Sequence, residues 1–242
     1  MKIRFWGTRG SIAKAGQSTL RYGGNTSCVE VRSAAGDLII LDAGTGLHGL
    51  AQSLLREPTA PRSGSLLISH THWDHIQGIP FFAPFYQPGQ RWSIFGPSGV
   101  HKSLDELLHG QMSQDYFPVA MEDFNAHVET CDLKEGHFSV GDISVTTQYL
   151  NHPGVTIGYR IVVDGKTLVY PRHSPTADAS PAAAAPRRPA AKTPATATSW
   201  PGPTSSSTTH STPLKSTTSA WAGATAPWST SPTSPSTPTC AA

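Results

Sequence analysis

The sequence predicts an α/β layered domain over residues 1–170, and three features of the chain predict it. Short segments rich in β-forming residues, separated by turns that contain glycine, open the chain. A segment whose leucines recur at helical spacing follows them. Strand-like and helix-like segments then alternate, which is the order typical of α/β layers.

The first elements that we expect are strands near residues 2–6, 27–32 and 37–41. Residues 33–37, which include Gly36, suit a hairpin connection between the last two. The three segments are short and β-rich, so they predict neighbouring strands at the start of a sheet.

Helix and strand then alternate along the middle of the chain. Residues 46–56 predict a helix, because apolar side chains recur on one face of it. Residues 65–69 predict a buried strand, residues 91–95 a further strand, and residues 100–112 a second helix.

The last predicted elements are again strands. Residues 138–149 alternate in part between apolar and polar, and residues 156–163 are β-rich. Residues 166–170 close a hairpin through the turn Asp164-Gly165.

The charge balance argues against two classes of partner. The formal net charge is +2, which is too small for a dedicated nucleic-acid or anionic-membrane surface, so we expect neither partner. No segment approaches the roughly 20 apolar residues that span a bilayer. The chain reaches Gly7 before an apolar run forms, so its start predicts a strand rather than a signal peptide, and we expect a cytoplasmic protein.

A run of metal-ligating residue types follows the strand at residues 65–69. His70, His72, Asp74 and His75 stand within six residues. Alternate strand residues face the same way, so His70 and His72 are expected to converge on one cation, with Asp74 and His75 facing a neighbouring one. Imidazole and carboxylate suit zinc, manganese or iron. The alternative, four polar residues of a surface loop, does not explain this density.

This run resembles the signature of the metallo-β-lactamase superfamily. Residues 41–46 resemble the first motif of that family, and residues 151–154 resemble its third. The resemblance implies an αββα sandwich with the metal site at one sheet edge. It implies that Asp42 supports the ligands and that His152 completes the first metal site. A helix N-cap is the alternative role for Asp42.

Residues 5–11 and 22–28 are similar to a narrower branch, which groups cyclic-phosphate phosphodiesterases with relatives of tRNA 3′-end processing nucleases. The branch implies two zinc ions and a metal-activated water that hydrolyses a small phosphodiester, a cyclic nucleotide or a cyclic sugar phosphate. Asp74 is then also the catalytic residue that orients the nucleophile and accepts its proton. Residues 81–86 either line a substrate pocket or a dimer contact or are ordinary core, so substrate-binding residues and a homodimer stay open.

Other functions use the same site. A thioester, lactone or β-lactam hydrolase is one alternative. A tRNA-processing nuclease is another, but it would require a long basic insertion that the sequence does not show. The third is an inactive metal-binding product that lacks two ligands.

The composition changes after residue 173. Residues 174–242 consist mainly of Ala, Pro, Ser and Thr, which predicts a disordered tail after a truncated hydrolase domain at residues 1–173. The resemblance implies a bridging aspartate just after Tyr170 and a histidine further on. The chain offers only His173 and His210 as substitutes.

We interpret the tail as a product of a frame-shift. Read one base out of frame, the codons of residues 199–207 permit a buried strand with an aspartate, and those of residues 221–228 permit a Gly-His-Ser segment. Coding DNA that encodes the tail without an indel would rule this out. For the chain as written we expect weak or absent turnover, reduced metal affinity and an exposed sheet edge.

Overall fold

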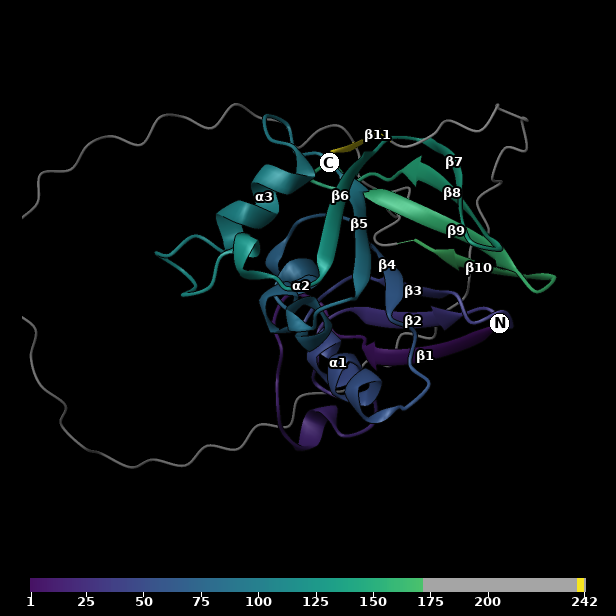
Figure 1. Ribbon diagram of the computed structural model, residues 1–242, viewed down its shortest axis with the longest axis horizontal. Coiled ribbons are helices and arrows are strands. Elements are labelled where there is room, and N and C mark those ends of the chain that lie inside the picture. The colour runs from purple at the N-terminus through teal and green to yellow at the C-terminus, as the bar shows by residue number, and fades with distance from the viewer. Residues whose placement is uncertain (172–238, 242) are drawn as a thin grey trace, which may run out of the picture. The chain divides into compact units, whose positions relative to one another are not determined.

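The computed structural model describes residues 1–171 and 239–241, and it places strands in two sheets (Figure 1). The larger sheet has the order β1-β2-β3-β4-β5-β6-β11 and the smaller one the order β10-β9-β8-β7. The strands of the larger sheet are β1 (Lys2–Gly7), β2 (Cys28–Arg32), β3 (Leu38–Leu41), β4 (Ser63–Leu67), β5 (Arg91–Pro97), β6 (His127–Leu133) and β11 (Thr239–Ala241). Those of the smaller sheet are β7 (Gly136–Val140), β8 (Ile143–Tyr149), β9 (Ile157–Val163) and β10 (Lys166–Tyr170).

The middle of the larger sheet is parallel. β3, β4, β5 and β6 run in the same direction, whereas β1, β2 and β11 pair antiparallel to their neighbours. The smaller sheet is antiparallel throughout. The carboxyl ends of β3 and β4 therefore meet at one edge of the larger sheet, where open α/β sheets place their ligands.

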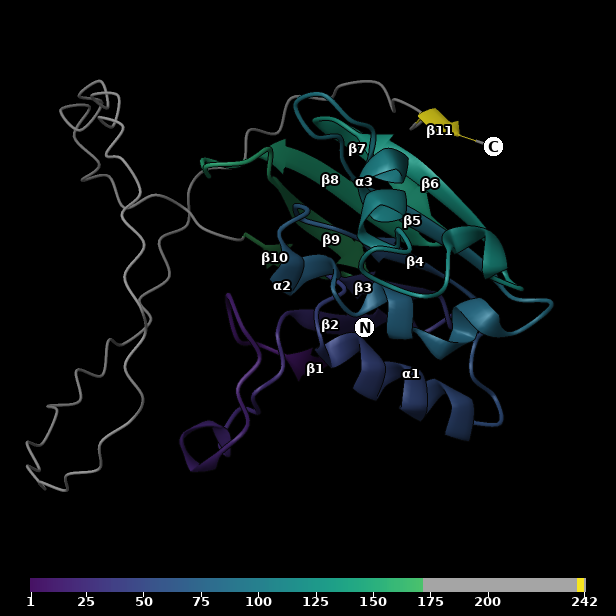
Figure 2. The ribbon, with the colours of Figure 1, turned by 90° about the vertical axis from the view of Figure 1, so that its left-hand side faces the viewer.

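The helices in the described part cover one face of the larger sheet, and the smaller sheet lies against the other (Figure 2). The helices are α1 (Gly46–Arg56), α2 (Trp73–Ile76) and α3 (Leu104–Gln111), with 3-10 turns η1 (Gln17–Thr19), η2 (Ile79–Phe81), η3 (Ala83–Tyr86) and η4 (Met121–Asp123). These layers confirm the predicted α/β sandwich. Most of the predicted tail, residues 174–238 and 242, lies outside the described residues, whereas residues 239–241 of it form β11 and pair with β6.

Each layer boundary holds an apolar core, because alternate strand residues point to opposite faces. Leu38, Ile40, Leu66 and Ile94 pack towards the helices. Ile39, Leu41, Leu67 and Phe95 pack towards the smaller sheet. No helix in the described part could cross a bilayer, since none is both long and apolar enough.

Several predicted elements differ from those observed. Residues 138–149 were expected as one strand but form β7 and β8, because Gly141 adopts a left-handed φ of 56° and turns the chain. The second helix begins at Leu104 rather than at residue 100. Ser103 is its N-cap, and the side-chain oxygen of Ser103 accepts a hydrogen bond from Glu106 N–H. β6 was not predicted at all.

Candidate metal centre

The predicted ligands of the run from His70 to His75 lie in the connection after β4 and in α2. Our expectation that His70 and His72 share one face of a strand was wrong, because β4 ends at Leu67 and both histidines lie in the connection to α2. Asp74 and His75 belong to the first turn of α2 itself. The direction of these side chains is therefore set by the connection and by the helix rather than by strand alternation.

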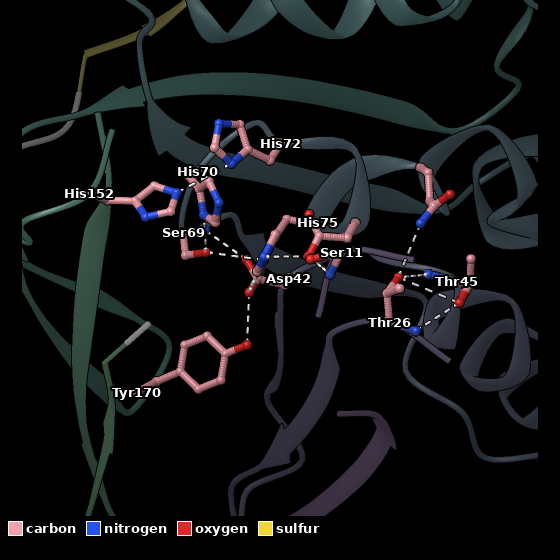
Figure 3. Close-up of polar contacts among 12 residues, drawn as sticks. Ser11, Thr26, Asp42, Thr45, Ser69, His70, His72, His75, His152 and Tyr170 are labelled. Atoms are coloured by element: carbon pink, nitrogen blue, oxygen red, sulfur yellow. Dashed lines mark hydrogen bonds and ion pairs between the residues drawn. The ribbon is translucent and has the colours of Figure 1, made fainter. Parts of the chain in front are cut away.

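Three of the predicted histidines converge. His70, His72 and His152 each place one ring nitrogen within 4.8 Å of the others (Figure 3). His152 comes from the connection between β8 and β9, in the smaller sheet. Its Nε2 lies 3.3 Å from Nδ1 of His72. Two imidazole nitrogens on one tetrahedral zinc lie about 3.3 Å apart, given Zn–N bonds of about 2.0–2.1 Å, so this spacing fits such an ion.

Asp74 and His75 form a second pair beside this cluster. Nε2 of His75 lies 3.2 Å from Oδ2 of Asp74. The backbone N–H of Ser11 donates to the same carboxylate oxygen over 2.7 Å. The ring of His75 lies 4.0 Å from that of His70, measured between centroids, so the pair and the cluster are adjacent.

Asp42 contacts several of the residues that build the site. It is fully buried directly after β3, with a left-handed φ of 58°. Its Oδ1 accepts a hydrogen bond from Ser69 N–H over 2.8 Å, and its Oδ2 lies 2.7 Å from Nδ1 of His75 and accepts from the Tyr170 hydroxyl over 2.7 Å (Figure 3). Because Nδ1 of His75 faces a carboxylate, its Nε2 is left to face Asp74. The N-cap of α1 is Thr45, so the N-cap alternative for Asp42 was wrong.

The protonation states suit a ligand site. Burial, together with neighbouring His75, lowers the pKa of His70 to about 3, so its imidazole is neutral at physiological pH and offers a lone pair. Burial by itself would raise the pKa of Asp42, but the hydrogen bond from His75 and those from Ser69 and Tyr170 hold it below its ordinary value. Both the imidazole and the carboxylate are thus in the states that bind cations.

Sequence reasoning did not assign three residues that contact this site. Ser69 lies within 3.1 Å of Nδ1 of His70, Tyr170 binds Asp42, and Ser11 binds Asp74. Ser11 stands in the glycine-rich segment that carried the branch resemblance, which was a usable signal. Tyr170 had none, because β10 belongs to the smaller sheet and reaches Asp42 only through the packing of the two sheets against each other.

The aromatic run at residues 81–86 was predicted either to be ordinary core or to line a substrate pocket or a dimer contact, and the structure divides it. Phe82 and Phe85 are buried in the helix-side core, as ordinary packing requires. Phe81 is 54% exposed. None of the other histidines of the described part joins the cluster of His70, His72 and His152. His173 and His210, the two predicted substitutes, lie outside the described residues.

Comparison with known families supports this reading of the fold. The family described as beta-lactamase superfamily domain matches residues 38–223, more than half of the chain. The chain belongs to the beta-lactamase superfamily. The match covers the run from His70 to His75 as well as His152.

Curated relatives of this superfamily member are named ribonuclease Z. The enzyme of Lactobacillus johnsonii is 28% identical over 170 residues, which is 67% of this chain and 49% of that protein. That of Macrococcus caseolyticus is 30% identical over 103 residues, or 40% of this chain and 31% of that one. The chain thus spans less than half of the length of these relatives.

Solved structures overlap the superfamily fold in part. The metallo-beta-lactamase fold protein YhfI from Bacillus subtilis superposes with a TM-score of 0.48 at 18% identity, over 69% of this chain and 59% of that one. The short form of human tRNase Z gives a TM-score of 0.48 at 19% identity, over 70% and 68%.

Proposed function

We propose that the chain is a metal-dependent hydrolase of phosphodiester bonds whose substrate is small, a cyclic nucleotide or a cyclic sugar phosphate. The observation that carries the proposal is the convergence of His70, His72 and His152 beside the Asp74–His75 pair. Three imidazoles whose ring nitrogens meet at one point gain little from each other, whereas a shared cation would bind one nitrogen of each ring.

The donor set fits zinc. The three histidines would hold one zinc ion with a position left open, and Asp74 and His75 would hold a second ion. Manganese or iron would accept the same ligands. When bound, such a cation acts as a Lewis acid that activates water at neutral pH and stabilises charge on the substrate.

The chain's own residues orient this site. Asp42 fixes the ring of His75 through Nδ1, and Ser11 N–H fixes Oδ2 of Asp74. Burial tends to raise the pKa of Asp74, but Ser11 N–H and His75 lower it below its ordinary value, so the carboxylate is ionised. Asp74 is therefore able to orient a nucleophilic water and accept its proton.

The relatives support phosphodiester chemistry and leave a second candidate. Because they are named ribonuclease Z, an RNA substrate is the alternative, and it would contradict our expectation of no nucleic-acid partner. Thioester, lactone and β-lactam hydrolysis remain alternatives on the same site.

A substrate panel tests the proposal. The full chain, loaded with zinc or manganese, would be assayed with 2′,3′-cyclic AMP, bis(p-nitrophenyl) phosphate, a precursor tRNA, a thioester, a lactone and a β-lactam. We expect slow, metal-dependent hydrolysis of the two small phosphodiesters and its loss in His152→Ala. Turnover confined to the thioester, lactone or β-lactam would refute the proposal. Metal binding with no turnover at all would replace it with the third alternative, an inactive metal-binding product.

A further inference from the structure

Two tyrosines of the smaller sheet reach the segments that carry the candidate metal ligands. Tyr170 of β10 and Tyr159 of β9 stand opposite each other in the register of these strands, so their side chains lie on the same face. The Tyr159 hydroxyl donates to Ile68 O over 2.6 Å, and the Tyr170 hydroxyl donates to Oδ2 of Asp42 over 2.7 Å. Each hydroxyl therefore crosses to the larger sheet and bonds to a residue that directly follows a parallel strand, β4 or β3.

The Tyr170 hydroxyl shares its acceptor with a predicted ligand. Oδ2 of Asp42 accepts from this hydroxyl and also lies 2.7 Å from Nδ1 of His75 (Figure 3). Nε2 of the same imidazole lies 3.2 Å from Oδ2 of Asp74. A continuous chain of polar contacts thus runs from β10 to the Asp74–His75 pair.

The orientation of the Asp42 carboxylate depends on these hydrogen bonds. Asp42 is fully buried, so its oxygens rely on donors from the protein. Ser69 N–H holds Oδ1, while the tyrosine hydroxyl and the ring of His75 hold Oδ2. Without the hydroxyl, the carboxylate is held less firmly. The ring of His75 is then held less firmly too, because groups that bond to the far side of a ligand imidazole set its orientation towards the metal.

We propose that Tyr170 is a positioning residue for the second metal position, the one that Asp74 and His75 would form. It acts through Asp42 and ties this position to the smaller sheet. Within the described residues, neither carboxylate oxygen of Asp42 bonds to an imidazole of the three-histidine cluster, so the effect belongs to the second position. The inference rests on the metal centre of the proposed function and not on its substrate.

Zinc binding, measured for each position separately, provides the test. The full chain would be titrated with zinc against a chelating dye, and His75→Ala and His152→Ala would assign each binding event to one position. We expect Tyr170→Phe to weaken the event that His75→Ala removes by about three- to tenfold, which is less than for a group that contacts the ligand directly. The event that His152→Ala removes should change by less than about twofold.

Tyr159→Phe is the matched control. It also removes a tyrosine hydroxyl that bonds across to the larger sheet, but the acceptor is the carbonyl oxygen of Ile68. We expect both variants to lose stability in urea, and only Tyr170→Phe to change the ratio of the two zinc affinities. A general loss of stability would therefore not reproduce the expected result.

Four results would overturn the inference. They are an unchanged ratio in Tyr170→Phe, tighter binding at the second position in that variant, an equal change in Tyr159→Phe, and a wild type without any zinc event that His75→Ala removes. Zinc affinity does not depend on turnover, so a chain that shows the expected ratio but hydrolyses no phosphodiester would refute the proposed function alone. A chain that hydrolyses a small phosphodiester with an unchanged ratio would refute the inference alone.

Discussion

At the residue scale, Asp42 combines the features of a positioning residue. It is fully buried, its backbone is left-handed, and its two carboxylate oxygens contact Ser69 and His75 of one local run and Tyr170 of the other sheet. A left-handed non-glycine residue costs conformational energy, which the surrounding hydrogen bonds must offset. Asp and Asn tolerate this conformation better than other residues do.

Replacing this carboxylate should therefore weaken both the fold and the site. We expect Asp42→Asn to lower the free energy of unfolding by about 2 kcal/mol, because an amide cannot accept all the hydrogen bonds that a charged carboxylate accepts. Urea unfolding in the presence of a chelator measures this without a metal contribution.

Asp164→Asn is the comparison, since Asp164 is also left-handed (φ 52°) but lies on the exposed β9–β10 turn, where it pairs with the N-terminal amine and accepts from Ala34 N–H. It should cost less than about 1 kcal/mol. Equal losses in the two variants would contradict the view that the buried hydrogen bonds of Asp42 determine the effect.

The sequence predicts the ligand candidates better than it predicts what holds them. The run from His70 to His75 is local, so its residue types and spacing are visible in the sequence alone. The contacts of Ser11 and Tyr170 are not visible in this way, because Ser11 lies in the segment after β1 and Tyr170 comes from β10 of the other sheet, both far from the run in sequence. Ligand roles for the run stay predictions until a metal is measured.

At the scale of elements, the backbone that follows β3 lies in close contact with the backbone at the end of α2. Ala43 N–H donates to His75 O over 2.7 Å, and Gly78 N–H donates to Ala43 O over 2.8 Å. A Cβ at Gly78 would lie 2.2 Å from Gly44 O, which is far closer than van der Waals contact. Glycine is required here by the close approach rather than by its φ.

Gly78→Ala should therefore push the backbone after α2 away from the backbone after β3. We expect a loss of about 1–3 kcal/mol in unfolding free energy, as for other overpacked sites. Gly110→Ala in α3 is the control, because a Cβ there meets nothing within 4 Å and alanine favours helix, so it should be neutral or stabilising. A Gly78→Ala protein as stable as the wild type would contradict the observed packing.

A charged contact joins the end of β2 to the end of α1. Nη1 and Nη2 of Arg32 donate to the two carboxylate oxygens of Glu57 over 2.8 and 2.9 Å. The Arg32 guanidinium lowers the pKa of Glu57 below its ordinary value. A lowered carboxyl pKa stabilises the fold above the unfolded pKa of about 4.3, and this contribution is lost as the pH falls through the folded pKa.

Glu57→Gln should then be less stable than the wild type at pH 7, by up to about 1 kcal/mol, and the difference should shrink below about pH 4. Urea unfolding across this pH range measures it. Glu122→Gln, whose side chain is 70% exposed, serves as the control. A difference that grows as the pH falls would reverse the sign expected from the ion pair.

Elements with a strong local signal were predicted well, and those without one were not. The helix at Gly46–Arg56 and the strand at Lys166–Tyr170 were predicted at their observed bounds. β6 was missed because charged and polar residues, among them Glu129 and Asp132, interrupt its apolar alternation. Its place in the sheet comes from parallel pairing with β5, which a single segment does not show.

At the scale of the molecule, the described part of the chain builds its candidate metal centre from residues that follow strands of both sheets. His70 and His72 follow β4 of the larger sheet, and His152 follows β8 of the smaller one. A cation held by all three would connect the two sheets across their shared core. Because binding to the folded state alone stabilises it, zinc should raise the unfolding temperature of the chain.

Zinc stoichiometry tests the central claim most directly. The full chain, His152→Ala and the exposed control His48→Ala would be dialysed to equilibrium against zinc, and the bound metal would be measured by mass spectrometry. The account predicts at least one zinc ion per chain in the wild type and in His48→Ala, and its loss in a folded His152→Ala. A wild type that binds no zinc, or a His152→Ala variant that binds as much as the wild type, would contradict the metal centre.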